Sequence, residues 1–162
     1  MVRRLPDPVY LVVARVLTHP RFHPIHRRIY RRTAGRGLVG HILGMDMHLL
    51  RTTGRWTGAP RTVPLGAIPD GDAWVVIGSN GGRDADPGWV HNLRAEPRAT
   101  IQLRCDSWPV IAHEADPPEA ARIWPIVVAA YPAYPAYPGY QVYRERTDRL
   151  IPLFVLDTAE AD

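Results

Sequence analysis

Five tyrosines recur at every third position between residues 131 and 143, and prolines separate the first four of them. Each proline removes a backbone donor and disfavours helical geometry in the residue before it, which excludes a regular helix there. A polyproline-like path turns once every three residues and would place the first four phenols on one edge. The alternative is a proline-rich linker with incidental aromatics. The five residues are Tyr131, Tyr134, Tyr137, Tyr140 and Tyr143.

A second candidate for chemistry is the segment "TTGRWTGAPR" at residues 52–61. Its two glycines allow close backbone approach, its threonines offer hydroxyl groups, and Arg55 and Arg61 flank it as forked donors. The segment is typical of a phosphate cradle. The alternative is an ordinary hairpin turn that carries two exposed arginines.

A third candidate is "GSNGGRDADPGW" at residues 78–89, which follows an apolar strand pattern and leads into a predicted helix. Backbone N–H groups along Ser79–Gly82, followed by a helix start at Asp86–Pro87, suit an anion or an electron-rich ring edge. We expect Trp89 and Asn92 beside this loop. The alternative is a plain loop with a core tryptophan.

Several other chemistries are excluded by the sequence. The chain has two serines and no G-x-S-x-G motif, one cysteine, and no G-x-G-x-x-G motif after a strand. His19, His23 and His26 could suggest a metal site, but prolines 20 and 24 interrupt the helix that would align them. No metal site is predicted.

The hydrophobic pattern predicts short strands joined by tight turns. Strands are expected at 47–53, 61–68 and 73–79 as a meander, at 99–105 and 108–116 as a hairpin across Asp106–Ser107, and at 151–157. Helices are expected at 86–97, with Asp86 as N-cap and Pro87 at the first position, from 117, and near 140–147. This pattern favours an antiparallel barrel over a parallel sheet.

Charge divides the 162-residue chain into a basic arm and a mildly acidic body. Residues 1–36 hold nine arginines and one acidic residue, whereas residues 37–162 hold eleven arginines and fifteen acidic residues. Helical stretches are expected at 9–17 and 25–32, the second with four arginines on one side. Such an arm binds an anionic membrane surface or covers an anionic site, or is merely a solvated helix. No nucleic-acid motif accompanies it. The pattern favours neither an export signal nor a membrane span.

Three segments together carry a family resemblance: "LLRTTGRWTGAPRTVPL", "VIGSNGGRDADPGWVHNLRAEPRATIQL" and "YPGYQVYRERTDRLIPLFVL". In order and spacing they resemble the deazaflavin (F420)-dependent nitroreductase family, over residues 26–157. The resemblance implies a mainly β fold with flanking helices, a split β-barrel of the flavin-mononucleotide-binding reductase type with about six antiparallel strands. We expect a basic helical arm at 1–40 and the barrel domain at 41–162.

The resemblance also implies the cofactor, coenzyme F420, and the residues that hold it. The first loop would hold the phosphate side, residues of the next strand would line the ring, and the second loop with Trp89 would hold the deazaflavin edge. The family commonly has Arg-Lys where this chain has Arg55-Trp56, so a compact ammonium donor is lost. The implied cofactor residues are Arg55, Trp56, Thr57, Gly58, Arg61, Val63, Pro64, Leu65, Gly78, Ser79, Asn80, Gly81, Gly82 and Trp89.

The family's tyrosine triplet fits this chain in two registers. Counted backward from "RTDRLIP" it falls on Tyr137, Tyr140 and Tyr143, which we favour as the catalytic set; counted forward from "IWPIVVAAYP" it falls on Tyr131, Tyr134 and Tyr137. The two extra Tyr-Pro-Ala units would then widen the rim of the site.

The implied function is hydride transfer from reduced F420 to an electron-poor acceptor such as a quinone or nitro compound. The alternative is a non-catalytic F420- or membrane-associated binding protein. We expect a monomer or homodimer in the cytoplasm of an actinobacterium, peripheral at the inner face of the plasma membrane through residues 1–36, with no nucleic-acid partner.

Overall fold

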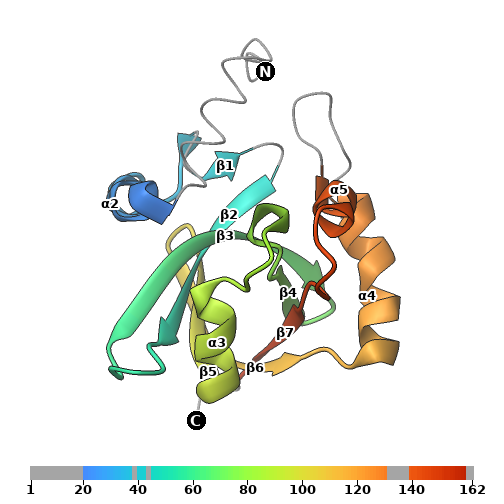
Figure 1. Ribbon diagram of the computed structural model, residues 1–162. Helices are drawn as coiled ribbons and strands as arrows, with labels where there is room; N and C mark the ends of the chain where they lie inside the picture. The colour runs from blue at the N-terminus through green and yellow to red at the C-terminus, as the bar shows by residue number, and fades with distance from the viewer. Residues whose placement is uncertain (1–19, 38–39, 43–44, 131–138, 160–162) are drawn as a thin grey trace.

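The computed structural model describes residues 20–37, 40–42, 45–130 and 139–159. A short 3-10 turn η1 (Pro20–Phe22) leads into helix α2 (His23–Thr33), and the remaining elements form and cover a barrel (Figure 1). The strands are β1 (His41–Ile42), β2 (Met45–Thr53), β3 (Pro60–Asp70), β4 (Ala73–Ile77), β5 (Arg98–Leu103), β6 (Asp106–Glu114) and β7 (Leu153–Thr158). The other helices are the 3-10 turn η3 (Asn80–Gly82), α3 (Gly88–Ala95), α4 (Pro117–Ala130) and α5 (Gly139–Glu145).

Strands β2 to β7 form a closed antiparallel barrel, which confirms the predicted fold. The strand order is β2-β3-β4-β7-β6-β5, and β5 pairs back onto β2 with Leu50 opposite Ile101. The predicted meander is present as β2–β3–β4. Closure leaves none of these six strands as an unpaired edge, so the barrel provides a rigid frame for the loops between its strands.

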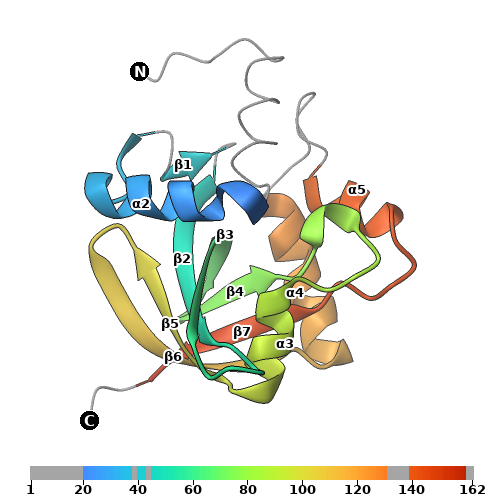
Figure 2. The ribbon, with the colours of Figure 1, turned by 60° about the vertical axis from the view of Figure 1, so that its left-hand side comes forward.

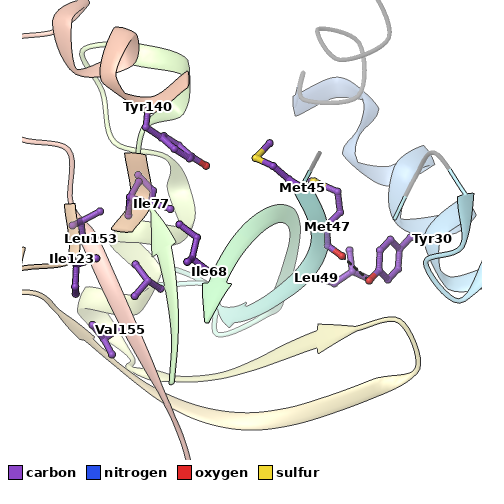
Figure 3. Packing of buried hydrophobic residues seen from close by; sticks show 12 residues of the cluster. Tyr30, Met45, Met47, Leu49, Ile68, Ile77, Ile123, Tyr140, Leu153 and Val155 are labelled. Carbon is purple, nitrogen blue, oxygen red and sulfur yellow. Dashed lines mark hydrogen bonds between the residues drawn. The ribbon is translucent and has the colours of Figure 1, made fainter. Parts of the chain in front are cut away.

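Two apolar layers hold the barrel together, one inside it and one between its outer face and the helices. Strand β4 shows both, because Val76 faces the inner layer while Val75 and Ile77 face the outer one. The same alternation on β7 explains why these strands read as continuous apolar runs. Figure 3 shows the outer layer, in which Tyr140 of α5 and Ile123 of α4 cover β4 and β7.

The β5–β6 hairpin turns earlier than the sequence predicts. We expected the turn at Asp106–Ser107, but β5 ends at Leu103 and β6 begins at Asp106. Arg104 takes a left-handed φ of 56°, and its N–H group donates to the hydroxyl of Tyr30 at 2.8 Å. A contact 74 residues away in sequence sets this turn, so no local signal could have located it.

Helix α3 also begins one residue later than predicted. Pro87 is the N-cap and Gly88 the first helical residue, and no side chain caps this end. The carboxylate of Asp86 instead accepts hydrogen bonds from Arg94 and Arg149, each at 2.8 Å. Two charge-assisted bonds outcompete the single backbone bond that an N-cap carboxylate would accept.

Helix α2 confirms the predicted stretch at 25–32 and lies against the barrel (Figure 2). Tyr30 is completely buried, and its hydroxyl group donates to the carbonyl of Met47 at 2.7 Å while accepting from Arg104. Arg27 donates to the carbonyl of Thr62 on β3 at 2.9 Å. The described part of the basic arm is therefore attached to β2, β3 and the β5–β6 turn. The predicted stretch at 9–17 lies outside the described residues.

We expect Tyr30→Phe to lower the free energy of unfolding by about 1–3 kcal/mol, because it leaves the buried carbonyl of Met47 and the partly buried N–H group of Arg104 without their partner. Burial raises the pKa of Tyr30 above its ordinary value of 10.0. The unfolded phenol then ionises first, so the parent should lose stability as the pH rises above about 10. Urea unfolding at pH 8 and at pH 10.5 measures both effects. A Phe variant as stable as the parent at pH 8 would contradict this prediction.

Candidate functional site

The first loop is closed by its own backbone. Gly54 donates to the carbonyl of Ala59, and Gly58, at a left-handed φ of 67°, donates to the carbonyl of Gly54, both at 2.8 Å. A Cβ atom added at Gly54 would lie 3.0 Å from the Ala59 oxygen and 3.3 Å from Nε of Arg61. Glycine at 54 therefore lets the loop backbone and the Arg61 guanidinium approach more closely than a larger residue would allow.

The cations of the first loop remain available for a ligand. Arg55 and Arg61 are exposed, and neither guanidinium pairs with a carboxylate among the described residues. Arg55 instead lies over the ring of Trp56, with its guanidinium carbon 4.8 Å from the ring centroid. Trp56 is 83% exposed, so this stacking holds Arg55 at the loop surface without burying it. This arrangement fits a phosphate group.

Helix α3 positions the first loop through Asn92. The side-chain oxygen of Asn92 accepts from the N–H group of Arg55 at 3.1 Å, and its amide nitrogen donates to the hydroxyl of Thr52 at 3.0 Å. Thr52 and Asn92 are both buried. We expected Asn92 beside the second loop; the hydrogen bonds of its amide go instead to the hairpin between β2 and β3.

The second loop has an unusual backbone. Ser79 is in the right-handed helical region, and Asn80, Gly81 and Gly82 follow with positive φ values of 49°, 68° and 77°. A right-handed residue followed by a left-handed one turns successive N–H groups to one side and forms an anion-binding concavity. The left-handed Asn80 is held by a bond from its own side chain to the carbonyl of Ala85 at 2.9 Å. The N–H group of Gly82 already donates to the carbonyl of Ser79 at 2.8 Å, so the geometry fits the predicted role as backbone donors for Ser79, Asn80 and Gly81.

Helix α5 places two of the predicted tyrosines beside this loop. A Cβ atom at Gly82 would lie 2.9 Å from the carbonyl oxygen of Tyr143, so the loop and helix touch at their backbones. Tyr140 is buried in the outer layer and packs edge-on against half-buried Tyr143, with ring centroids 6.0 Å apart. Figure 3 shows the hydroxyl of Tyr140 directed toward Met45. Tyr131, Tyr134 and Tyr137 lie outside the described residues.

The residues expected along the deazaflavin ring occupy two environments. Pro64 of β3 is buried, whereas Val63 and Leu65 are partly buried against the inner layer. Trp89 is also buried in the inner layer, where it meets Phe154 edge-on at 5.7 Å. Trp89 is therefore part of the barrel core. Its contact with a cofactor remains a prediction.

Arg149 is a functional candidate that the sequence pattern did not indicate. The guanidinium of Arg149 contacts the backbone of the second loop at Gly78, Ser79 and Arg83. The sequence offers only an arginine ahead of an apolar strand, which is too common a feature to single out.

The described residues also line a cavity of about 530 Å³ between the end of α2 and the β5–β6 turn. Arg36, Arg104 and Cys105 lie on its wall, and none of the site residues predicted from the sequence does. The predicted site residues lie instead on the two loops and α5, and α3 lies between the β2–β3 hairpin and η3 (Figures 1 and 2).

Comparison with known proteins agrees with this geometry. The family model for F420H(2)-dependent quinone reductase matches residues 22–158. The chain is 39% identical over 136 residues to an F420H(2)-dependent quinone reductase of Mycobacterium tuberculosis, covering 82% of this chain and 87% of that protein. A putative F420H(2)-dependent quinone reductase of Mycobacterium bovis matches to the same extent.

Two solved structures share the fold at a sequence identity above 30%. One, an F420-H2 dependent reductase, has a TM-score of 0.60 at 32% identity and covers 68% of this chain and 93% of its own. The other, a domain-swapped dimer, has a TM-score of 0.63 at 31% identity, and the match covers 81% of this chain and 92% of that structure's chain. These findings confirm the resemblance to F420-dependent reductases: the chain belongs to the F420H(2)-dependent quinone reductase family.

Proposed function

We propose that this protein transfers a hydride from reduced coenzyme F420 to a quinone. The observation that carries the proposal is the pairing of two unlike loops on one barrel. One has two arginines with no carboxylate partner in the described part of the chain, and the other has backbone N–H groups turned to one side. The first suits a phosphate and the second suits the electron-rich edge of a heterocycle. Family membership supplies the identity of a cofactor that has both.

The chain's own residues would hold the cofactor at three places. Arg55, Arg61 and the backbone of Thr57–Gly58 would bind the phosphate side, and Trp56 would keep Arg55 at the surface. Strand β3 would run along the ring at Val63, Pro64 and Leu65. The second loop, through the backbone N–H groups of Ser79, Asn80 and Gly81, would hold the deazaflavin edge together with Trp89.

When bound, reduced F420 supplies a hydride, which a quinone accepts together with a proton to become a hydroquinone. The protein's part is to orient the two rings and to hold a proton donor near the acceptor oxygen. Tyr140 and Tyr143 are the phenols that the structure describes beside the second loop, and Tyr137 belongs to the same predicted set. Flat aromatic surfaces at the rim suit a planar acceptor.

Binding and turnover test this function separately. We expect F420 to bind more tightly than flavin mononucleotide in equilibrium dialysis, and reduced F420 to be oxidised when a soluble quinone is added, as followed by its absorbance. Tighter binding of flavin mononucleotide would refute the cofactor assignment. F420 binding without turnover on any quinone or nitro compound would instead support the non-catalytic alternative.

We also propose that residues 1–36 of the basic arm contact an anionic membrane surface. Phe22, Ile25 and Ile29 form an exposed stripe along η1 and α2, beside the buried residues of α2, and they are 38%, 55% and 41% exposed. Exposed arginines at 28, 31 and 32 flank the stripe, and α2 contains no acidic residue. An apolar edge next to cations is typical of a helix that lies in the membrane interface. None of the helices in the described part of the chain is long and apolar enough to cross a bilayer.

If the basic arm contacts a membrane, the protein should sediment only with vesicles that contain anionic lipid. The protein should pellet with phosphatidylglycerol vesicles and remain in solution with phosphatidylcholine vesicles, and Ile25→Glu with Ile29→Glu should abolish the pelleting. Ile111→Glu, on an exposed residue of β6, is the matched control and should pellet like the parent. Equal behaviour with both vesicle types would count against the membrane assignment.

A further inference from the structure

We propose that Arg149 is a positioning residue that holds the second loop in its cofactor-binding shape. This inference rests on the proposed function of that loop. The side chain of Arg149 lies between η3 and β7 and is only 15% exposed. Its guanidinium donates to the loop carbonyls and to Asp86, so an effect of this residue on binding would pass through the loop backbone.

Every N–H direction of this guanidinium has an acceptor. Its Nη2 atom donates to the carbonyls of Gly78 and Ser79, at 2.9 and 2.8 Å. Its Nε atom donates to the carbonyl of Arg83 at 2.8 Å. Its Nη1 atom donates to Asp86 at 2.8 Å and to the carbonyl of Leu150 at 3.4 Å. One side chain thus holds three carbonyls across the loop and the carboxylate at its end.

These contacts decide where the loop's N–H groups point. In a planar trans peptide the C=O and the following N–H group point in opposite directions. The described residues contain no cis peptide bond. Because Arg149 draws in the carbonyls of Gly78 and Ser79, the N–H groups of Ser79 and Asn80 face away from it. These are two of the N–H groups that form the proposed concavity.

A charge network anchors the arginine itself. Asp86 accepts from Arg149 and also from Arg94 of α3, and Arg94 binds Glu114 of β6 through two bonds of 2.7 Å. The network alternates in sign and connects the second loop to α3 and the barrel wall. If Arg149 is replaced, Asp86 still has Arg94 as a partner, so the variant leaves no unpaired carboxylate.

Lysine cannot replace this arginine, although it keeps the charge. An ammonium group has three donors at a single point, whereas the guanidinium presents five N–H donors in a rigid planar fork. It therefore cannot reach carbonyls on both ends of the loop. This difference separates a positioning role from a general need for positive charge at residue 149.

The experiment compares Arg149→Lys with Arg122→Lys. Arg122 also makes a two-bond ion pair, with Asp70, but lies on α4. Hydrogen exchange of a peptide covering residues 78–86, measured without any ligand, should be roughly tenfold faster in Arg149→Lys and unchanged in Arg122→Lys. The Kd for F420 should rise by about tenfold or more in the first variant only. The KM for reduced F420 should rise with it, while kcat at saturation falls much less.

Two further variants keep the test decisive. Asp86→Asn removes the carboxylate charge that anchors Arg149 and should also speed hydrogen exchange in the loop. This variant tests the proposal if Arg149→Lys does not fold. Arg94→Gln leaves the carbonyl contacts of Arg149 in place and should leave loop exchange near the parental rate. Parental exchange and parental Kd in a folded Arg149→Lys would overturn the proposal. If the parent itself fails to bind F420 while loop exchange still responds, the cofactor assignment fails and the positioning role stands.

Discussion

Replacing Arg61 with alanine should weaken F420 binding by about 1–3 kcal/mol, roughly a 5- to 150-fold rise in Kd, and Arg55→Ala should act in the same direction. The reason is that both cations lie at the open face of the first loop without a carboxylate partner among the described residues. Their charge is therefore available to the phosphate rather than neutralised within the protein. Fluorescence titration of F420 against each purified variant measures the effect.

A surface arginine outside the loop provides the control for this experiment. Arg98 on β5 is exposed and pairs only loosely with Glu96, at 3.5 Å. Arg98→Ala makes the same change in net charge and should leave Kd within about twofold of the parent, since screened surface charges act weakly at a distance. Unchanged Kd values for both loop variants, with the fold intact, would disprove the phosphate-side assignment.

Loss of the phenol at the site should act on the chemical step. We expect Tyr140→Phe and Tyr143→Phe to lower kcat, with a drop of about a hundredfold for the phenol that delivers the proton. Tyr143 is half-buried where α5 touches η3, and Tyr140 packs against it. Steady-state rates with reduced F420 and a quinone give kcat and KM separately.

Deleting residues 131–136 tests the extra Tyr-Pro-Ala units, whereas the phenylalanine variants test the phenols at the site. A rim that adds stacking area acts on substrate binding, so the deletion should mainly raise KM for the quinone or change which acceptors are used. Abolished activity on deletion, together with parental kcat in both Phe variants, would show that the forward register is correct. Tyr131, Tyr134 and Tyr137 would then be the phenols at the ring.

Tyr140→Phe needs one more measurement because Tyr140 is 7% exposed and belongs to the outer layer. A loss of stability alone could lower activity by reducing the folded fraction. Thermal unfolding of the same preparations separates the two effects. A lower kcat in protein that remains fully folded at the assay temperature identifies a role in the reaction.

Local sequence patterns predicted most of the architecture. Alternating apolar residues and turn residues such as "PDGD" predicted the meander, which is present as β2–β3–β4. Pro97 and Pro117 correctly marked the end of α3 and the start of α4. These signals are reliable because they act on the backbone within a few residues, through the restricted φ of proline and the period of strand side chains.

The two loops were predicted by composition, and their shapes were not. Gly54 and Gly58 indicated close backbone approach, and backbone donors were expected along Ser79–Gly82. The positive φ values of Gly58, Asn80, Gly81 and Gly82 were not predicted. The attachment of Asn92 to the first loop could not be predicted from local sequence. Its partners, Thr52 and Arg55, are 40 and 37 residues away.

By itself, the sequence determined the strand and helix types, the two candidate loops, the basic arm and the family, because all of these depend on residue type and spacing. Tertiary structure decided the β5–β6 turn, the start of α3, the orientation of Asn92 and the part that Arg149 plays in the second loop. Each of these depends on a hydrogen bond between residues that only the closed barrel brings together. A polar side chain can form hydrogen bonds of similar strength with many groups. Which bond it forms depends on which groups lie within reach and away from water, and this is set only by the folded structure.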